Sequence, residues 1–209
     1  MSLSWLERRK MTPIGTLNTG WGVCGFTSTL YSLYELNPGM RRLLINRSRI
    51  GGTVLAEIKT YLTMLQAENS HLLQSIQEFT QTFDLPGWTI NNYIEEINKA
   101  SSLDQKAILA RKEYGIAMPP EAVVDYVRRV WGLHAERWKW SGDPGADGII
   151  GVSNQMKTMS MYNGLCHWMY RSNRKIYSWG KVFNSVRAAG ENVGANYQVE
   201  HFILISRPK

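Results

Sequence analysis

A cysteine that follows a glycine-rich segment is the residue best placed for chemistry in this 209-residue sequence. Gly20 and Gly22 precede Cys24, and residues 26–35 after it are compatible with a helix. A thiol at the start of a helix lies beside unpaired backbone N–H groups and the positive end of the helix dipole, which favour the thiolate. Because the thiolate is the nucleophilic form, this placement predicts a reactive Cys24. The side-chain amide of Asn18, six residues earlier, is expected to donate to an oxyanion that forms beside the sulfur.

A nucleophilic cysteine needs a base to take its proton, and two of the four histidines open β-like segments. His167 lies in the segment 165–171, and a second segment, 175–183, returns at once. With Ser172 and Asn173 as a two-residue hairpin turn, Ser178 is expected opposite His167. His201 begins the most apolar of these segments, close to the end of the chain. The pattern favours His167 because a returning strand can supply an orienting group, and His201 stays open as the alternative base.

The run from Asn18 to Ser28 resembles the nucleophile motif of papain-like cysteine peptidases. In that family a glutamine lies six residues before the cysteine, and here Asn18 takes its place. The resemblance implies that Cys24 attacks a carbonyl carbon and that His167 or His201 is the general base. It also implies a third catalytic residue, either Ser178 on the next strand or Asn184. Asn184 lies seventeen residues after His167, close to the family's offset for its asparagine.

The same resemblance gives expectations about function. It implies a papain-like cysteine peptidase or amidase that cleaves an amide bond in a protein or a peptidoglycan-stem peptide, without a cofactor or a metal. The small size and basic character are also typical of a bacterial effector or toxin that is exported without a signal peptide. A toxin of that class would have a cognate inhibitor protein as a partner.

Charge and composition restrict the other classes. The chain carries a formal net charge of +7 and has a pI near 9.5, which indicates an anionic partner or surface. The basic residues are scattered, and no RNA-binding signature or phosphate-binding loop is found, so nucleic acid is not the expected partner. The alternative to the enzyme is a non-enzymatic basic α+β module that binds a protein or a nucleic acid, with Cys24 as a structural thiol.

Cysteine usage and hydropathy give the expected location. Two cysteines, Cys24 and Cys166, are too few for a disulfide framework, which predicts reduced thiols. The first ten residues lack the apolar centre of a secretory signal, and no apolar run is long enough to span a bilayer. We therefore expect synthesis in the cytoplasm and no membrane span.

Periodicity predicts an α+β, papain-like fold in which a helical N-terminal two-thirds packs on a C-terminal antiparallel sheet. Apolar residues recur at helical spacing over 51–80, 89–100, 103–114 and 120–131. Strands are expected at 165–171, 175–183 and 197–206. We expect a single domain over residues 1–209, with a helical lobe at about 22–140 and a β lobe at about 146–209.

Overall fold

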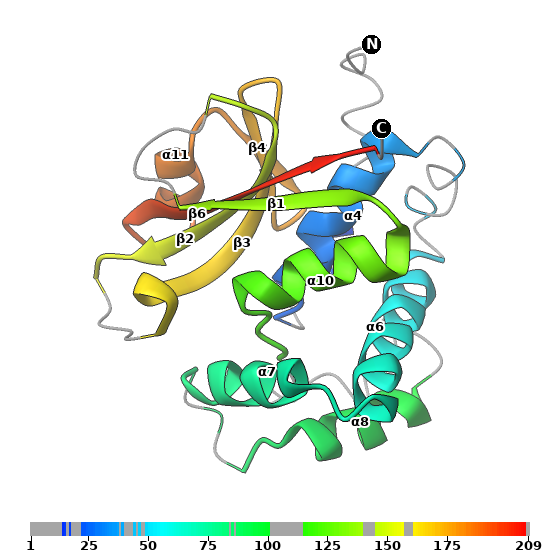
Figure 1. Ribbon diagram of the computed structural model, residues 1–209. Coiled ribbons are helices and arrows are strands. Elements are labelled where there is room, and N and C mark those ends of the chain that lie inside the picture. The colour runs from blue at the N-terminus through cyan, green and yellow to red at the C-terminus, as the bar shows by residue number, and fades with distance from the viewer. Residues whose placement is uncertain are drawn as a thin grey trace.

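The chain folds as an α+β protein in which helices pack against one six-stranded antiparallel sheet (Figure 1). The computed structural model describes residues 14–15, 17, 22–37, 39, 44, 46, 49–83, 85, 87–100, 115–139, 145–156 and 161–207. The α+β class predicted from the sequence is confirmed.

Five helices in the described part of the chain precede the sheet. They are α4 (Cys24–Leu36), α6 (Ile50–Ala67), α7 (His71–Gln81), α8 (Ile90–Lys99) and α10 (Pro120–Trp131). Helix α8 lies one residue inside each end of the predicted range 89–100, and α10 matches the predicted range 120–131. Thr89 caps α8 by accepting a hydrogen bond from the Asn92 N–H at 3.2 Å. Helix α10 begins at Pro120, and proline fits this position because an N–H in the first turn has no partner within the helix. The helix is ended by Gly132, which has the left-handed conformation.

The long amphipathic stretch expected over 51–80 is two helices. Asn69 has a φ of 50°, which a continuous helix does not allow, and Ser70 then caps α7. None of the helices among the described residues combines the length and apolarity needed to cross a bilayer. The helix expected over 103–114 lies outside the described residues.

The sheet has the strand order β1-β6-β2-β3-β4-β5, and every neighbouring pair is antiparallel. Its strands are β1 (His134–Lys139), β2 (Gly148–Asn154), β3 (Leu165–Ser172), β4 (Lys175–Ser178), β5 (Lys181–Phe183) and β6 (Tyr197–Ser206). The turn η1 (Met161–Gly164), in which Tyr162 and Asn163 have left-handed backbone angles, leads into β3, and α11 (Val186–Glu191) lies between β5 and β6.

The expected strands were incomplete. Strands β1 and β2 were not predicted, and β1 lies within the range expected for the helical lobe. The single strand expected over 175–183 is divided by a turn at Trp179 and Gly180. The hairpin turn is formed by Asn173 and Arg174, one residue later than predicted, and both have positive φ, 49° and 60°.

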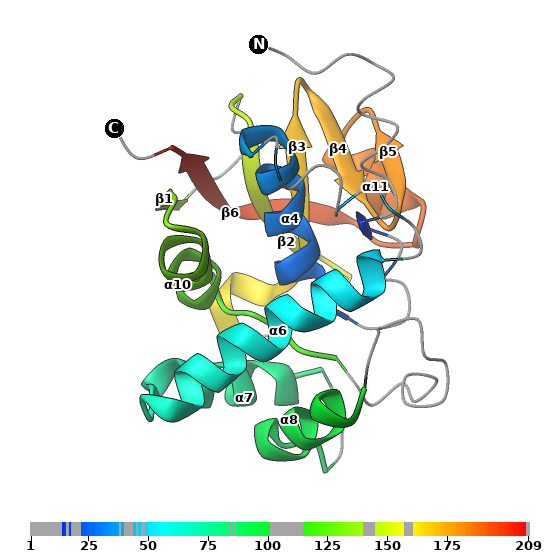
Figure 2. The ribbon, with the colours of Figure 1, turned by 90° about the vertical axis from the view of Figure 1, so that its right-hand side faces the viewer.

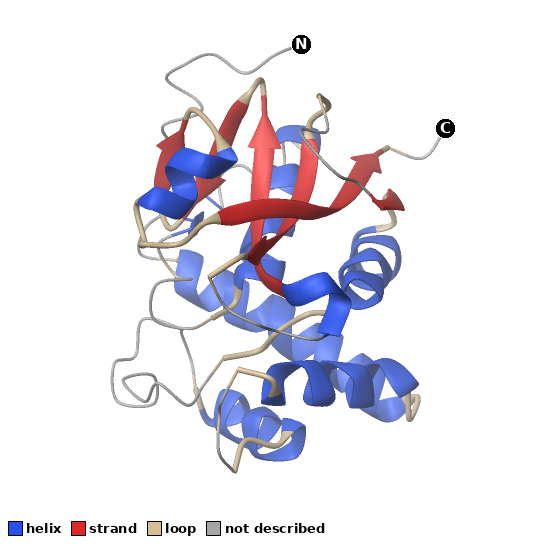
Figure 3. Ribbon diagram, turned by 90° about the vertical axis from the view of Figure 1, so that its left-hand side faces the viewer, coloured by secondary structure: helices blue, strands red, loops and turns tan. Residues whose placement is uncertain are grey.

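Two apolar layers lie on the two faces of the sheet. The larger layer contains α4, α6 and α10 and includes Phe26, Tyr126, Trp168 and Ile203. The smaller layer lies beneath α11 and includes Met169 and other residues of β2, β4 and β6. Figure 2 shows α4 against one face, and Figure 3 shows α11 on the opposite face. A side chain of the sheet therefore points either toward α4, α6 and α10 or toward α11, and this direction decides what each candidate residue can reach.

Candidate active site

Cys24 is the first residue of α4, which begins two residues before the segment 26–35 that was expected to be helical. The turn before it contains Gly22, whose φ of 57° favours glycine, and the Ile116 N–H donates to the Gly22 carbonyl at 3.3 Å. The first turn of α4 is packed tightly, because a Cβ on Gly25 would lie 2.8 Å from the sulfur of Met118. The residues around Met118 therefore hold the start of α4 in place.

The electrostatics of the Cys24 thiol differ from the prediction. Burial raises the pKa of Cys24 to about 11, although backbone N–H groups of Trp168, Gly25 and Cys24 itself lower it. The helix start supplies the expected donors, but desolvation of the charged thiolate outweighs them. Cys24 is therefore a neutral thiol at neutral pH, and the prediction of a preformed thiolate is wrong.

His167 is buried on β3 and is held by Ser178. The Nε2 atom of His167 lies 2.7 Å from the Ser178 Oγ. The two residues are not directly opposite, because Tyr170 pairs with Tyr177 and the register thus places Ser178 beside Met169. The predicted partnership of His167 and Ser178 is present, although the predicted pairing is displaced by the later turn.

Aromatic rings enclose the His167 imidazole. Trp179 stacks on it with ring centres 4.2 Å apart and planes 4° apart, and Tyr197 lies nearly parallel at 6.1 Å. Burial lowers the pKa of His167 to about 3, so the imidazole is neutral at physiological pH. Neither aromatic residue was a sequence candidate. The glycine in Ser178-Trp179-Gly180 is a turn signal inside the expected strand, and it could have drawn attention to Trp179.

Cys24 and His167 approach β3 from its two faces. The backbone N–H that points at the Cys24 sulfur belongs to Trp168, the residue next to His167. Trp168 belongs to the core layer beneath α4, whereas the partners of His167, Trp179 and Tyr197, pack with the layer under α11. In the part of the chain that the structure describes, no hydrogen bond joins Cys24 to a histidine.

Tyr197 lies close to both Cys24 and His167. Burial raises the pKa of Tyr197, and the negative charges of the Cys166 and Cys24 thiolates raise it further. The phenol that stacks near His167 is therefore also within Coulombic range of both thiols. Cys166 itself donates its S–H to the Val152 carbonyl at 3.4 Å.

His201, the alternative base, belongs to a different cluster. Its Nε2 lies 2.9 Å from the Tyr162 carbonyl oxygen, and its Nδ1 lies 3.4 Å from Arg137. Glu121 contacts the same group, through the Tyr162 hydroxyl at 2.7 Å and Arg137 at 3.5 Å. Burial lowers the pKa of His201. Both ring nitrogens therefore have partners other than Cys24.

The remaining candidates are not brought to Cys24. Asn184 is exposed beyond β5, where its Oδ1 accepts a hydrogen bond from Lys175 at 2.6 Å, so it does not orient His167. Asn18, the expected oxyanion donor, lies outside the described residues. Among the residues that are described, no cluster of three or more His, Cys, Asp and Glu side chains could hold a metal ion.

Comparisons with known proteins give no relative. No family model, no curated protein and no solved structure matches this chain. The candidate site must therefore be interpreted from its own geometry.

Proposed function

We propose that this protein is a cysteine hydrolase of papain-like fold that cleaves an amide bond in a protein or a peptidoglycan-stem peptide. The observation that supports it is the arrangement at the start of β3. Cys24 begins α4 and receives the Trp168 N–H, while the adjacent His167 is oriented by Ser178 at 2.7 Å. Nucleophile, base and orienting group are the three components that covalent amide hydrolysis requires.

The hydrogen bond between His167 Nε2 and Ser178 fits the mechanism in one tautomer of the imidazole. In that tautomer Nε2–H donates to the Ser178 Oγ, and Nδ1 is unprotonated and able to accept the thiol proton. In the reaction, the Cys24 sulfur attacks the carbonyl carbon while its proton passes to Nδ1. His167 then returns that proton to the leaving amine, and water hydrolyses the thioester.

The protonation states favour one form of this mechanism. A thiol with a pKa of about 11 beside an imidazole with a pKa of about 3 does not form an ion pair in the resting protein. Proton transfer must therefore accompany attack on the carbonyl instead of preceding it. Because the two side chains lie on different faces of β3 in the resting protein, the mechanism requires that substrate binding rearranges the start of this strand until Nδ1 reaches the sulfur.

The test uses purified peptidoglycan-stem peptides and a mixed peptide library, with cleavage followed by mass spectrometry. Cys24→Ala should abolish cleavage in a protein that unfolds at the wild-type temperature. His167→Ala should slow it by roughly 10²- to 10⁴-fold, whereas the exposed control His71→Ala and the alternative base His201→Ala should leave turnover unchanged in folded protein. Full activity of folded Cys24→Ala would end the proposal, and loss in His201→Ala alone would transfer the role of base.

The proposal includes the biological setting suggested by the resemblance, namely a bacterial effector or toxin, export without a signal peptide and a cognate inhibitor protein. A second candidate function, a basic binding module, is favoured by an arginine-lined groove on the α11 face. If the protein is such a binding module, the wild-type protein cleaves none of the peptides, and Cys24 is a structural thiol.

A further inference from the structure

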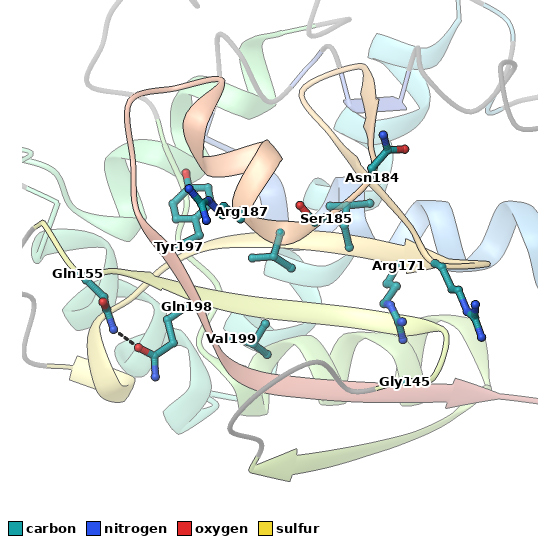
Figure 4. A pocket seen from close by; sticks show the side chains of 12 residues that line it. Gly145, Gln155, Arg171, Asn184, Ser185, Arg187, Tyr197, Gln198 and Val199 are labelled. Atoms are coloured by element: carbon teal, nitrogen blue, oxygen red, sulfur yellow. Dashed lines mark hydrogen bonds between the residues drawn. The ribbon is translucent and has the colours of Figure 1, made fainter.

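A groove lies on the face of the sheet opposite α4, between α11 and the strands β3, β4 and β6 (Figure 4). Its volume is about 940 Å³, near the upper end of the range for ligand sites, roughly 300–1,000 Å³. Three arginines line it: Arg171 from β3, Arg174 from the hairpin turn and Arg187 from α11. The groove is thus a concave site in which cationic groups from separate elements converge.

The groove region holds much of the chain's positive charge. Residues 171–192 contain five lysines and arginines but only one acidic residue, Glu191, in a chain with a net charge of +7. The lysines there bind neutral amides: Lys175 donates to Asn184 at 2.6 Å, and Lys181 donates to Asn192 at 2.9 Å. Hydrogen bonds to amides satisfy the donors of these two lysines without cancelling their charge, which therefore still attracts an anion to this region.

The arginines differ in how firmly they are held. Arg171 is buried, and its Nη1 donates to the Ala146 carbonyl at 2.8 Å, which fixes the guanidinium at the groove wall. Arg187 pairs with Glu191 at 2.8 Å, but both side chains are highly exposed, and such a pair is easily exchanged. Arg174 is exposed and occupies a left-handed position where glycine is the usual residue. The hairpin therefore carries a cationic side chain at a position of backbone strain.

The other lining groups indicate the kind of anion. Gln155 and Gln198 hydrogen-bond each other at one end, and Ile176, Val186 and Val199 supply apolar surface between the polar ends. Amide side chains pair with peptide groups, and apolar surface receives side chains. Tyr197 is the only aromatic residue among the described residues that line the groove, and it lies against the rings of His167 and Trp179. The described lining thus offers no free aromatic platform of the kind on which single-stranded nucleic acids stack.

We propose that this groove binds an extended acidic peptide segment, with carboxylates at the exposed Arg174 and Arg187 and the peptide backbone along Gln155 and Gln198. Arginine recognises carboxylates through paired N–H donors. Tyr197 both lines the groove and stacks near His167, so a bound peptide would run toward the candidate active site. The binding itself does not require Cys24 chemistry, so the site stands whether or not the chain is a hydrolase.

The test is fluorescence anisotropy with labelled hexaglutamate at physiological ionic strength. Two groove variants change exposed residues. Arg174→Glu replaces a cation with a carboxylate, and Gln198→Glu replaces a neutral amide with a carboxylate and leaves every cation in place. Each should weaken binding by about tenfold or more, as expected for a lost or opposed charge-assisted hydrogen bond. The matched control is Lys99→Glu on α8, which gives the same charge change as Arg174→Glu on a side chain that is 63% exposed. It should weaken binding less than about twofold, since it acts only through screened long-range charge.

Three outcomes would overturn the proposal. One is no saturable binding of hexaglutamate to the wild-type protein. Another is an equal loss in Lys99→Glu, which would mean that net charge alone attracts the peptide. The third is equally tight binding of a thymidine oligonucleotide with the same sensitivity to both groove variants, which would indicate a site for nucleic acid. Unchanged hexaglutamate binding by Cys24→Ala keeps this result separate from that of the hydrolase proposal.

Discussion

Alkylation of Cys24 tests the electrostatic reasoning about the candidate nucleophile most directly. In a Cys166→Ser background Cys24 is the only thiol, and its reaction with iodoacetamide can be followed by mass spectrometry from pH 6 to pH 10. The unfolded protein in urea provides a matched control because it contains the same thiol without burial. Burial raises the pKa of Cys24 from 9.0 to about 11, so the folded protein carries about a hundredfold less thiolate at neutral pH.

Intrinsic nucleophilicity offsets part of that difference. A more basic thiolate reacts faster with a Brønsted slope of about 0.4–0.5, which returns roughly tenfold over this pKa range. The folded protein should therefore react about ten times more slowly than the unfolded protein before any steric hindrance, and its rate should keep rising up to pH 10. A rate that levels off between pH 7 and pH 9, or one above that of the unfolded chain, would refute the reasoning. The helix start and the Trp168 N–H would then outweigh burial.

Three further predictions concern the groups that build the site. His167 has a pKa of about 3 in the folded chain against about 6.5 unfolded, so the unfolded state gains a proton first as the pH falls. Stability should therefore be complete above pH 6.5 and fall by about 2 kcal/mol at pH 5, as measured by urea unfolding. His167→Gln should lose most of this dependence and keep the part due to His201, whose pKa burial also lowers, whereas His71→Gln should keep all of it; an identical dependence in all three proteins would contradict the burial argument. Gly151→Ala should destabilise the protein by about 1–3 kcal/mol, because its Cβ would lie 2.7 Å from the buried Trp168 ring. If Gly151→Ala unfolds at the wild-type urea concentration, β2 and the Trp168 indole can move apart at no cost in stability. Trp168→Phe should cost about 1–3 kcal/mol, since the Met118 carbonyl loses the indole N–H that it accepts at 2.8 Å. Unchanged stability would mean that another donor replaces the indole.

The sequence by itself determined the elements whose signals are local. Helices α8 and α10 followed from apolar spacing and end signals, and β3 and β6 followed from runs of apolar and aromatic residues. A helix just after the glycines was predicted over residues 26–35, and α4 extends this range to Cys24–Leu36. Strands β1 and β2 were missed for physical reasons. Strand β1 is rich in charged residues, and β2 contains Gly151, a residue that disfavours strands but leaves space here for the Trp168 ring.

Tertiary structure alone decided what the candidate residues can do. Strand irregularities adjoin both histidines: the pairing of β2 shifts beside Cys166 on β3 and beside Glu200 on β6. A one-residue shift moves a side chain from one face of a sheet to the other, and no local pattern announces it. The pKa values of Cys24 and His167 depend on burial by segments far away in the chain. The sequence could therefore identify a thiol at a helix start and a histidine on a strand. Only the packing of α4, β3 and the Trp179 turn determined that both are neutral and that they meet β3 from opposite faces.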